Sequence, residues 1–356
     1  MKKIFFTPGP TELFPTVSHH IDEALEENIC SISHRSETFK QIYARTVDSL
    51  RKLLNIPKDF HVFFLGSATE AMERIIENCV EEQSCHFVNG AFSGRFFEIA
   101  QSLKKCPTKF EVEFGMGFDL RKFEVKKNVE LICFTQNETS SGVAINMDDI
   151  YEMKHRYPDT LFALDIVSSV PYIKIDYANI DCTLFSVQKG FGLPAGLGIL
   201  IINEMCIEKT RKLEKMNFNI GSYHNFSNLV DHSQKNQTVE TPNVLAIFLL
   251  GRVCEDYLRI GIENIRNETE IKAFCLYDFF DKHGKYNPFV KKHIERSNTI
   301  IVINTPGGSG EIVERLAKKG FVIGTGYGRK YQERQIRIAN FPMHSLEEIE
   351  RMISFL

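Results

Sequence analysis

Short β-rich runs alternate with helical patterns through the middle of this 356-residue chain. The apolar stripe is clearest over residues 67–80, where it repeats with the 3.6-residue period of a half-buried helix. Alternation of strands and helices predicts an α/β fold in which a mostly parallel sheet carries helices on both faces. The strands that we expect are His61–Gly66, Cys85–Asn89, Val129–Thr135, Thr160–Asp165, Cys182–Val187 and Gly196–Ile202.

The pattern changes after Thr241 and Pro242. A long helical stretch covers residues 243–283, and a shorter α/β segment follows it. The final helix should begin near Ser345, because Ser345 and Glu348 have the spacing of a capping box. The strands expected in this part lie near Thr299–Asn304, Phe321–Ile323 and Gln335–Ala339.

This change in the pattern of helices and strands predicts two domains. The length of the chain suits one large domain and a smaller one better than three independent units. We expect the large domain over residues 15–250. The small α/β domain should cover residues 251–356, together with the N-terminal segment 1–14.

Charge and composition exclude several classes of partner. Lys and Arg total 43 against 46 Asp and Glu, a net charge of −3, so neither nucleic acid nor an anionic membrane is expected. The apolar run at residues 244–250 is far shorter than the roughly 20 residues of a membrane helix. The residues before Pro8 are too few for a signal peptide. Nine cysteines without a Cys-x-x-Cys pair favour free thiols, no metal and a cytoplasmic location.

Two charged residues follow strands in the middle of the chain. Asp165 closes one expected strand, while Lys189 follows another and precedes a glycine-rich loop. Ligands of open α/β sheets bind along the edge where such strands end. Burial there would lower the pKa of the Lys189 amine, as an imine-forming nucleophile requires. On these residues alone, a plain strand end and a helix cap remain the alternative.

Two further segments could bind anions. Residues 66–69 join a strand to the striped helix, so their N–H groups could bind a phosphate, although simple capping by Ser67 is the alternative. Arg337 lies in an alternating strand, and its guanidinium could clamp an α-carboxylate through two parallel hydrogen bonds. A surface salt bridge is the alternative there.

Several motifs resemble those of one enzyme family. Asp-Ile-Val-Ser-Ser at residues 165–169 and Val-Gln-Lys-Gly-Phe-Gly-Leu-Pro-Ala-Gly at residues 187–196 resemble the aspartate and lysine motifs of the class V, fold-type I aminotransferases, which depend on pyridoxal 5′-phosphate (PLP). Matching motifs in the same order are Pro8-Gly9-Pro10, Ser33-His34-Arg35-Ser36, Asn137-Glu138-Thr139-Ser140-Ser141-Gly142 and Ile336-Arg337-Ile338. The resemblance covers nearly the whole chain. It implies a large domain built on a mostly parallel sheet of the seven-stranded type, with a small α/β domain.

The resemblance also implies roles for single residues. Lys189 would hold PLP as a Schiff base and, once released, act as the acid–base at the substrate. Asp165 would pair with the pyridine nitrogen of the cofactor. Thr139 and Phe92 would contact its ring, although the phosphoserine aminotransferases commonly carry Trp where this chain has Phe92. The residues that would bind the cofactor phosphate are Ser67, Ala68, Thr69, Gln188 and Thr241.

One of these phosphate contacts implies an assembly. In the family the residue matching Thr241 reaches across a dimer interface, so we expect a homodimer with shared active sites. The family commonly has Asn just before that position, where this chain has Glu240. A carboxylate there would repel the phosphate.

The substrate-binding residues that the resemblance implies are His34, Arg35 and Arg337. The first two match residues that hold the additional anionic group in the phosphoserine aminotransferases. The expected reaction is therefore transamination between glutamate and 3-phosphohydroxypyruvate, giving phosphoserine and 2-oxoglutarate in serine biosynthesis. Further candidate cations before Arg337 are Arg329, Lys330 and Arg334, for which a solvated loop is the alternative.

Other functions remain open at this point. An alanine–glyoxylate or serine–glyoxylate aminotransferase would share the PLP site but need fewer cations. A PLP-fold lyase or a binding protein without transaminase activity is a further alternative. A nucleotide-binding dehydrogenase is disfavoured, because the glycines at 324, 326 and 328 lack the βαβ context of a dinucleotide site. A cysteine desulfurase is disfavoured because Cys275 lies in a helical pattern and not in a mobile loop.

Overall fold

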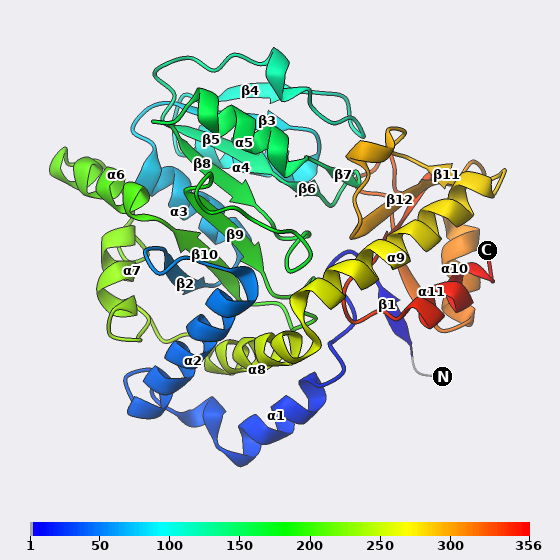
Figure 1. Ribbon diagram of the computed structural model, residues 1–356, viewed down its shortest axis with the longest axis horizontal. Helices are drawn as coiled ribbons and strands as arrows, with labels where there is room; N and C mark the ends of the chain where they lie inside the picture. The colour runs from blue at the N-terminus through cyan, green and yellow to red at the C-terminus, as the bar shows by residue number, and fades with distance from the viewer. Residues whose placement is uncertain (1–2) are drawn as a thin grey trace.

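The computed structural model describes residues 3–356. It contains a seven-stranded sheet and a five-stranded sheet, which lie side by side along the long axis of the molecule (Figure 1). A two-stranded hairpin, β6 (Asn137–Glu138) and β7 (Val143–Ala144), lies on the side of the large sheet that faces the small one (Figure 1). Within residues 3–356, no helix has the length and apolar character needed to cross a membrane.

The large sheet has the strand order β2-β10-β9-β8-β5-β3-β4. All neighbouring pairs from β9 to β4 are parallel, whereas β10 is antiparallel to both β9 and β2. The expected mostly parallel sheet is therefore confirmed, with β4 as a strand that the sequence did not predict. The bounds are β2 His61–Leu65, β3 Ser84–Val88, β4 Thr108–Glu111, β5 Leu131–Thr135, β8 Leu161–Asp165, β9 Cys182–Ser186 and β10 Gly198–Ile202.

Both faces of the large sheet are covered by helices, as the alternation predicts. Successive side chains of a strand point to opposite faces, so Phe134 packs with one apolar cluster and Cys133 with the other. Helices α2, α5 and α8 contribute to the first cluster, and α3, α4, α6 and α7 to the second. The helix bounds are α1 Val17–Glu26, α2 Glu37–Leu54, α3 Ala68–Cys79, α4 Ala91–Ser102, α5 Met147–Arg156, α6 Glu204–Lys215, α7 Phe226–Ser233 and α8 Val244–Ile260.

The small sheet has the order β1-β13-β14-β12-β11. Strand β1 comes from the N-terminus and pairs in parallel with β13, so the two ends of the chain lie in the same part of the molecule (Figure 1). Helices α9, α10 and α11 pack on this sheet through an apolar cluster of their own. The bounds are β1 Ile4–Phe6, α9 Ile262–Lys282, β11 Asn287–Pro288, β12 Ile300–Asn304, α10 Gly310–Lys318, β13 Phe321–Thr325, β14 Gln335–Ala339 and α11 Leu346–Ile353.

The long helical stretch predicted over residues 243–283 is confirmed, and it consists of two helices, α8 and α9. Gly261 separates α8 from α9 with a φ of 89°, a left-handed conformation that glycine adopts without steric cost. The capping box predicted at the last helix is confirmed, because Ser345 Oγ accepts from Glu348 N while the Glu348 carboxylate accepts from Ser345 N.

Candidate active site

A cavity of about 240 Å³ lies at the edge of the large sheet where β8 and β9 end. The cavity is closed from the other side by β14 and the loop before it, which belong to the small sheet. Predicted site residues that line it are Ser67, Ala68, Thr69, Phe92, Thr139, Asp165, Gln188, Lys189 and Arg337. Pro8 and Gly9 also line it, and they belong to the Pro8-Gly9-Pro10 motif that resembles the family's N-terminal substrate-site turn. Lining residues for which no role was predicted are Met72, Val167, Ser186 and Tyr327.

Lys189 is the buried amine of this cavity. Its side chain is 6 % exposed, and its Nζ donates to Thr139 Oγ1 at 2.7 Å. The same Nζ lies 5.1 Å from the centre of the Phe92 ring. Burial lowers the pKa of Lys189 to about 8, against the attraction of nearby carboxylates. About a tenth of the amine is therefore neutral and nucleophilic at pH 7, and this share rises with pH.

The backbone closes tightly around this lysine. Gly9 has a φ of 138°, and a Cβ atom there would lie 2.8 Å from Lys189 Cε. Gly190 has no room for a side chain either, because a Cβ would lie 1.9 Å from the Val170 carbonyl oxygen. Tyr257 is fully buried and donates its hydroxyl to the Gly190 carbonyl at 2.8 Å. These contacts fix the backbone that carries the amine.

Asp165 is the buried carboxylate at the end of β8. It is 3 % exposed, and its oxygens accept from Val167 N at 2.9 Å and from Thr135 Oγ1 at 3.3 Å. Burial raises the pKa of Asp165 to about 6, although Lys189 and these hydrogen bonds favour its charged form. The carboxyl group is mostly ionised at neutral pH and can accept a hydrogen bond from a protonated nitrogen.

Glu138 organises the wall of the cavity, a role that the sequence did not reveal. Its fully buried carboxylate accepts from the backbone N–H groups of Phe92 and Ser93 at the start of α4, and from the Ser140 hydroxyl at 2.6 Å. A negative charge at a helix N-terminus is stabilised by the helix dipole. Glu138 thereby fixes both Phe92 and the neighbouring Thr139. Its position in the Asn-Glu-Thr motif was the available signal.

The turn between β2 and α3 presents the predicted anion site. Ser67 caps α3, because its hydroxyl accepts from Glu70 N at 3.1 Å. Ala68 N donates to Ser186 Oγ at 2.8 Å. The capping interpretation is therefore correct for Ser67, yet the turn still lines the cavity with Thr69. Both properties agree with a helix N-terminus that faces a ligand.

Arg337 reaches the cavity from the small sheet. Its Nε donates to the Thr325 carbonyl at 2.7 Å and its Nη1 to the Thr139 carbonyl at 3.3 Å. The guanidinium lies 5.3 Å from the Tyr327 ring, and that ring lies 5.4 Å from the Phe92 ring. Burial lowers the pKa of Arg337 to about 10, so the group keeps its charge at neutral pH. No ion pair joins Arg337 to an acid among residues 3–356, unlike the surface salt bridge that was its alternative.

Three predicted residues lie outside the cavity of a single chain: His34, Arg35 and Thr241. The Arg35 guanidinium instead donates to the backbone carbonyls of Thr238 and Val239, so it supports the segment that leads to Thr241. Their binding roles stay predictions and would require a second subunit. The candidate cations of the loop before β14 are exposed and do not line the cavity either; they are Arg329, Lys330 and Arg334.

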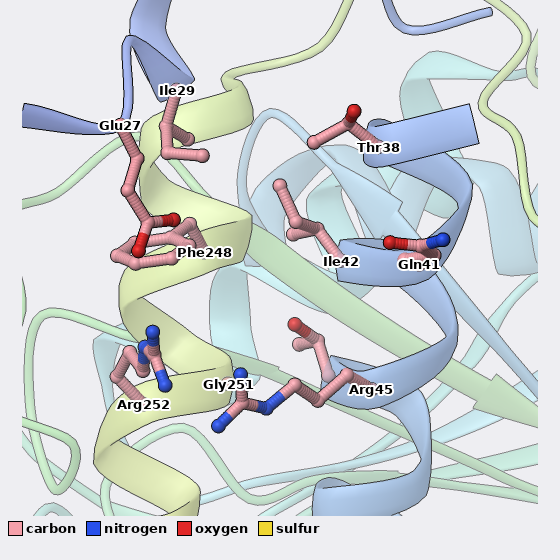
Figure 2. A pocket seen from close by; sticks show the side chains of 10 residues that line it. Glu27, Ile29, Thr38, Gln41, Ile42, Arg45, Phe248, Gly251 and Arg252 are labelled. Carbon is pink, nitrogen blue, oxygen red and sulfur yellow. The ribbon is translucent and has the colours of Figure 1, made fainter. Parts of the chain in front are cut away.

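A second cavity, of about 260 Å³, lies between α2 and α8 (Figure 2). The Arg45 side chain extends from α2 toward α8, which carries Arg252 (Figure 2). Both guanidinium groups are paired, the first with Glu255 and the second with Glu23. This cavity shares no lining residue with the one around Lys189.

The donor set of the first cavity fits PLP. It combines a buried amine, a buried carboxylate, an aromatic ring beside the amine, and a helix N-terminus for a phosphate. Ser67, Ala68 and Thr69 would hold the phosphate, and Asp165 would face the pyridine nitrogen.

Comparison with known proteins identifies the family. The model of the aminotransferase class-V family matches residues 4–337. The chain belongs to the class-V aminotransferases. Such enzymes are PLP-dependent transaminases, and PLP is the cofactor of this chain.

Relatives of this class-V aminotransferase include several with a named substrate. A crystal structure of a phosphoserine aminotransferase from Cytophaga hutchinsonii is 46 % identical, with a TM-score of 0.98, over 99 % of this chain and 98 % of that one. A phosphoserine aminotransferase of Corynebacterium glutamicum is 24 % identical over 98 % of this chain and 92 % of its own length. An alanine–glyoxylate aminotransferase from Nostoc shares the fold, with a TM-score of 0.84 at 19 % identity over 100 % of this chain and 94 % of that one.

Proposed function

We propose that this class-V aminotransferase exchanges an amino group between glutamate and 3-phosphohydroxypyruvate, giving phosphoserine and 2-oxoglutarate in serine biosynthesis. This proposal for the chemistry rests on one observation: Lys189, Asp165 and Arg337 line the same cavity. Lys189 and Asp165 are a buried pair, and Arg337 has no acidic partner among residues 3–356. The choice of substrate is supported by the 46 % identity to a phosphoserine aminotransferase over almost the whole length of both chains.

The residues that line the cavity have separate roles in the reaction. When bound, PLP supplies an aldehyde that condenses with amines and a ring that spreads negative charge away from the substrate Cα. Lys189 moves the proton at that carbon, because its amine has a pKa near the working pH. Asp165 holds the proton on the pyridine nitrogen, and Thr139 orients the lysine amine.

Substrate orientation comes from the other side of the cavity. Arg337 binds the α-carboxylate that both substrates carry. Within residues 3–356 its Nη2 has no hydrogen-bond partner and its Nη1 has one, so N–H groups remain for charge-assisted hydrogen bonds. Phe92 and Tyr327 lie across the cavity from each other and narrow it between the two sheets.

We further propose a cytoplasmic homodimer in which Thr241 contacts the cofactor phosphate of the partner. This is supported by the position of Thr241, His34 and Arg35 outside the single-chain cavity, where a neighbouring subunit could use them. The cysteines of the described residues are free thiols, which suits a reducing compartment.

A second candidate function is transamination of small amino acids with glyoxylate. The observation that favours it is that, within the described residues of a single chain, Arg337 is the one arginine lining the cavity. A substrate with one carboxylate would need no more, whereas phosphoserine needs further cations for its phosphate.

A half-reaction assay separates the two candidates. Glutamate, phosphoserine, alanine and serine are added singly to the PLP-loaded protein, and the visible absorption band of the bound cofactor is followed. We expect phosphoserine and glutamate to bleach the band at micromolar to millimolar concentration, and alanine to act much more weakly. Bleaching by alanine but by neither of the other two would replace the phosphoserine assignment with the glyoxylate one.

A further inference from the structure

His224 is a buried histidine that the chemistry described above does not use. It lies between α6 and α7 and is 2 % exposed. Its Nδ1 is hydrogen-bonded to the Glu70 carboxylate and its Nε2 to the Glu240 carboxylate. The ring of Tyr223 stacks on it, with the centres 4.0 Å apart. One imidazole thus bridges two acids that are distant in the sequence.

The first of these acids belongs to the phosphate-binding turn. Glu70 lies in the first turn of α3, and its second carboxylate oxygen accepts from Gly66 N at 2.8 Å. Its own N–H donates to the Ser67 hydroxyl. Glu70 therefore holds the first two residues of the turn that is proposed to bind the cofactor phosphate.

The second acid belongs to the segment that carries Thr241. Glu240 directly precedes Thr241, and its backbone carbonyl accepts from Thr238 Oγ1 at 2.7 Å. Arg35 holds the carbonyls of Thr238 and Val239 from the other side. The bridge through His224 joins this segment to α3.

The charges of the three groups explain how an acid can stand beside a phosphate site. Although burial opposes protonation, the hydrogen-bonded carboxylates of Glu240 and Glu70 raise the pKa of His224 to about 9. The imidazole is therefore a cation at neutral pH. Arg74 of α3 lies close to Glu70 but is already paired with Glu73 and Glu77.

We propose that His224 is a positioning residue for the cofactor phosphate: it ties the turn at residues 66–69 to the segment carrying Thr241, and it neutralises Glu240. This inference rests on the proposed phosphate-binding role of that turn. It also accounts for the departure from the family pattern at Glu240, since the repulsion expected there is offset within the same chain.

The test compares PLP with pyridoxal, which lacks the phosphate, as ligands of the PLP-free protein. His224→Gln should weaken PLP binding about tenfold or more, because a charge-assisted contact near the phosphate is lost and a buried carboxylate is left uncompensated. Pyridoxal binding should change by less than about twofold. His232→Gln on α7 is the matched control, because among residues 3–356 that imidazole bonds only the Asn228 carbonyl, and the change should leave both affinities unchanged.

A double variant tests the charge. Glu240→Gln removes the acid that His224 neutralises, so His224→Gln/Glu240→Gln should recover most of the lost PLP affinity, to within about threefold of the parent. Equal weakening of PLP and pyridoxal in His224→Gln would show a general structural role and overturn the proposal. So would unchanged PLP affinity, or a double variant no better than His224→Gln.

The pH dependence provides a second readout. The ratio of PLP to pyridoxal affinity should fall as pH rises through about 9, because the His224 cation is lost there. Lys189 titrates in the same range but affects both ligands equally, so the ratio isolates the phosphate. The groups facing His224 are Glu70, Glu240 and Tyr223, and the raised pKa of Tyr223 keeps its hydroxyl neutral at this pH. His224→Gln should abolish the fall, and a fall that persists in that variant would overturn the proposal.

The outcome of the His224 experiments does not depend on which substrate the enzyme uses. A protein that binds PLP and shows the His224 effect, but responds to neither phosphoserine nor glutamate, would contradict the proposed function alone. A protein that turns over phosphoserine and shows no His224 effect would contradict this inference alone.

Discussion

The two sheets contribute different electrostatic environments to the same cavity. On the large-sheet side, Lys189 and Asp165 are both buried and carry opposite charges. On the small-sheet side, the Arg337 guanidinium donates to backbone carbonyls and lies beside the ring of Tyr327. The first side therefore holds a pair of charges that compensate each other, and the second holds a cation with no acidic partner among residues 3–356.

This difference separates the chemistry from recognition. Burial lowers the pKa of Lys189 and raises that of Asp165, against the attraction between the two charges, and such shifted groups suit proton transfer. A cation without an acidic partner is available for an anionic ligand. We therefore expect changes on the large-sheet side to affect turnover, and changes on the small-sheet side to affect substrate affinity.

The largest effect is expected for Lys189→Ala. Loss of the amine should lower transamination by about 10²- to 10⁴-fold, the usual contribution of a positioned acid–base group. Steady-state turnover of glutamate with 3-phosphohydroxypyruvate measures it, while a thermal melt checks that the fold is kept. Lys330→Ala, in the exposed loop, is the matched control and should retain turnover. Full activity of Lys189→Ala would remove this residue from the chemistry.

Asp165→Asn should have the next largest effect. The amide cannot stabilise a positive charge on the pyridine nitrogen, so kcat should fall about 10- to 100-fold, as expected for a lost charge-assisted hydrogen bond. KM should change much less. Thr135→Val removes only a weak hydrogen-bond donor to the same carboxylate, at 3.3 Å, and should lower kcat less. A change in KM without a change in kcat would break the division between the two sides.

The large-sheet side is also the part that the sequence predicts best. Asp165 is the last residue of a strand, while Lys189 and the turn at residues 66–69 follow strands, so their place at one edge follows from strand order and direction. Local patterns of apolar residues and glycines were sufficient to find them.

Contacts between distant segments could not be predicted in the same way. Tyr327 reaches the cavity only because β13 and β14 place their connecting loop opposite Phe92. His224 looks like any polar loop residue until folding brings Glu70 and Glu240 to its two nitrogens. No local period or motif marks such residues, because their partners are set by tertiary packing.

On the small-sheet side, Arg337→Lys should raise KM about tenfold for both amino-acid and oxo-acid substrates, because an ammonium cannot form the two parallel hydrogen bonds of a guanidinium. The affinity for PLP should stay unchanged. Arg334→Lys, in the exposed loop before β14, is the control and should have no effect on KM. A loss of kcat at unchanged KM would mean that Arg337 belongs with the chemistry.

The smallest effect is a pair of opposite pH shifts that links the two sides. The reactive form of Lys189 is the neutral amine, so the rate of PLP uptake by the PLP-free protein should rise with pH through about 8. Arg337 contributes to lowering the pKa of Lys189, whereas Asp165 raises it. Arg337→Gln should therefore move the midpoint to higher pH, and Asp165→Asn to lower pH. Shifts in the same direction would show that the two sides do not act on the amine as separate charges.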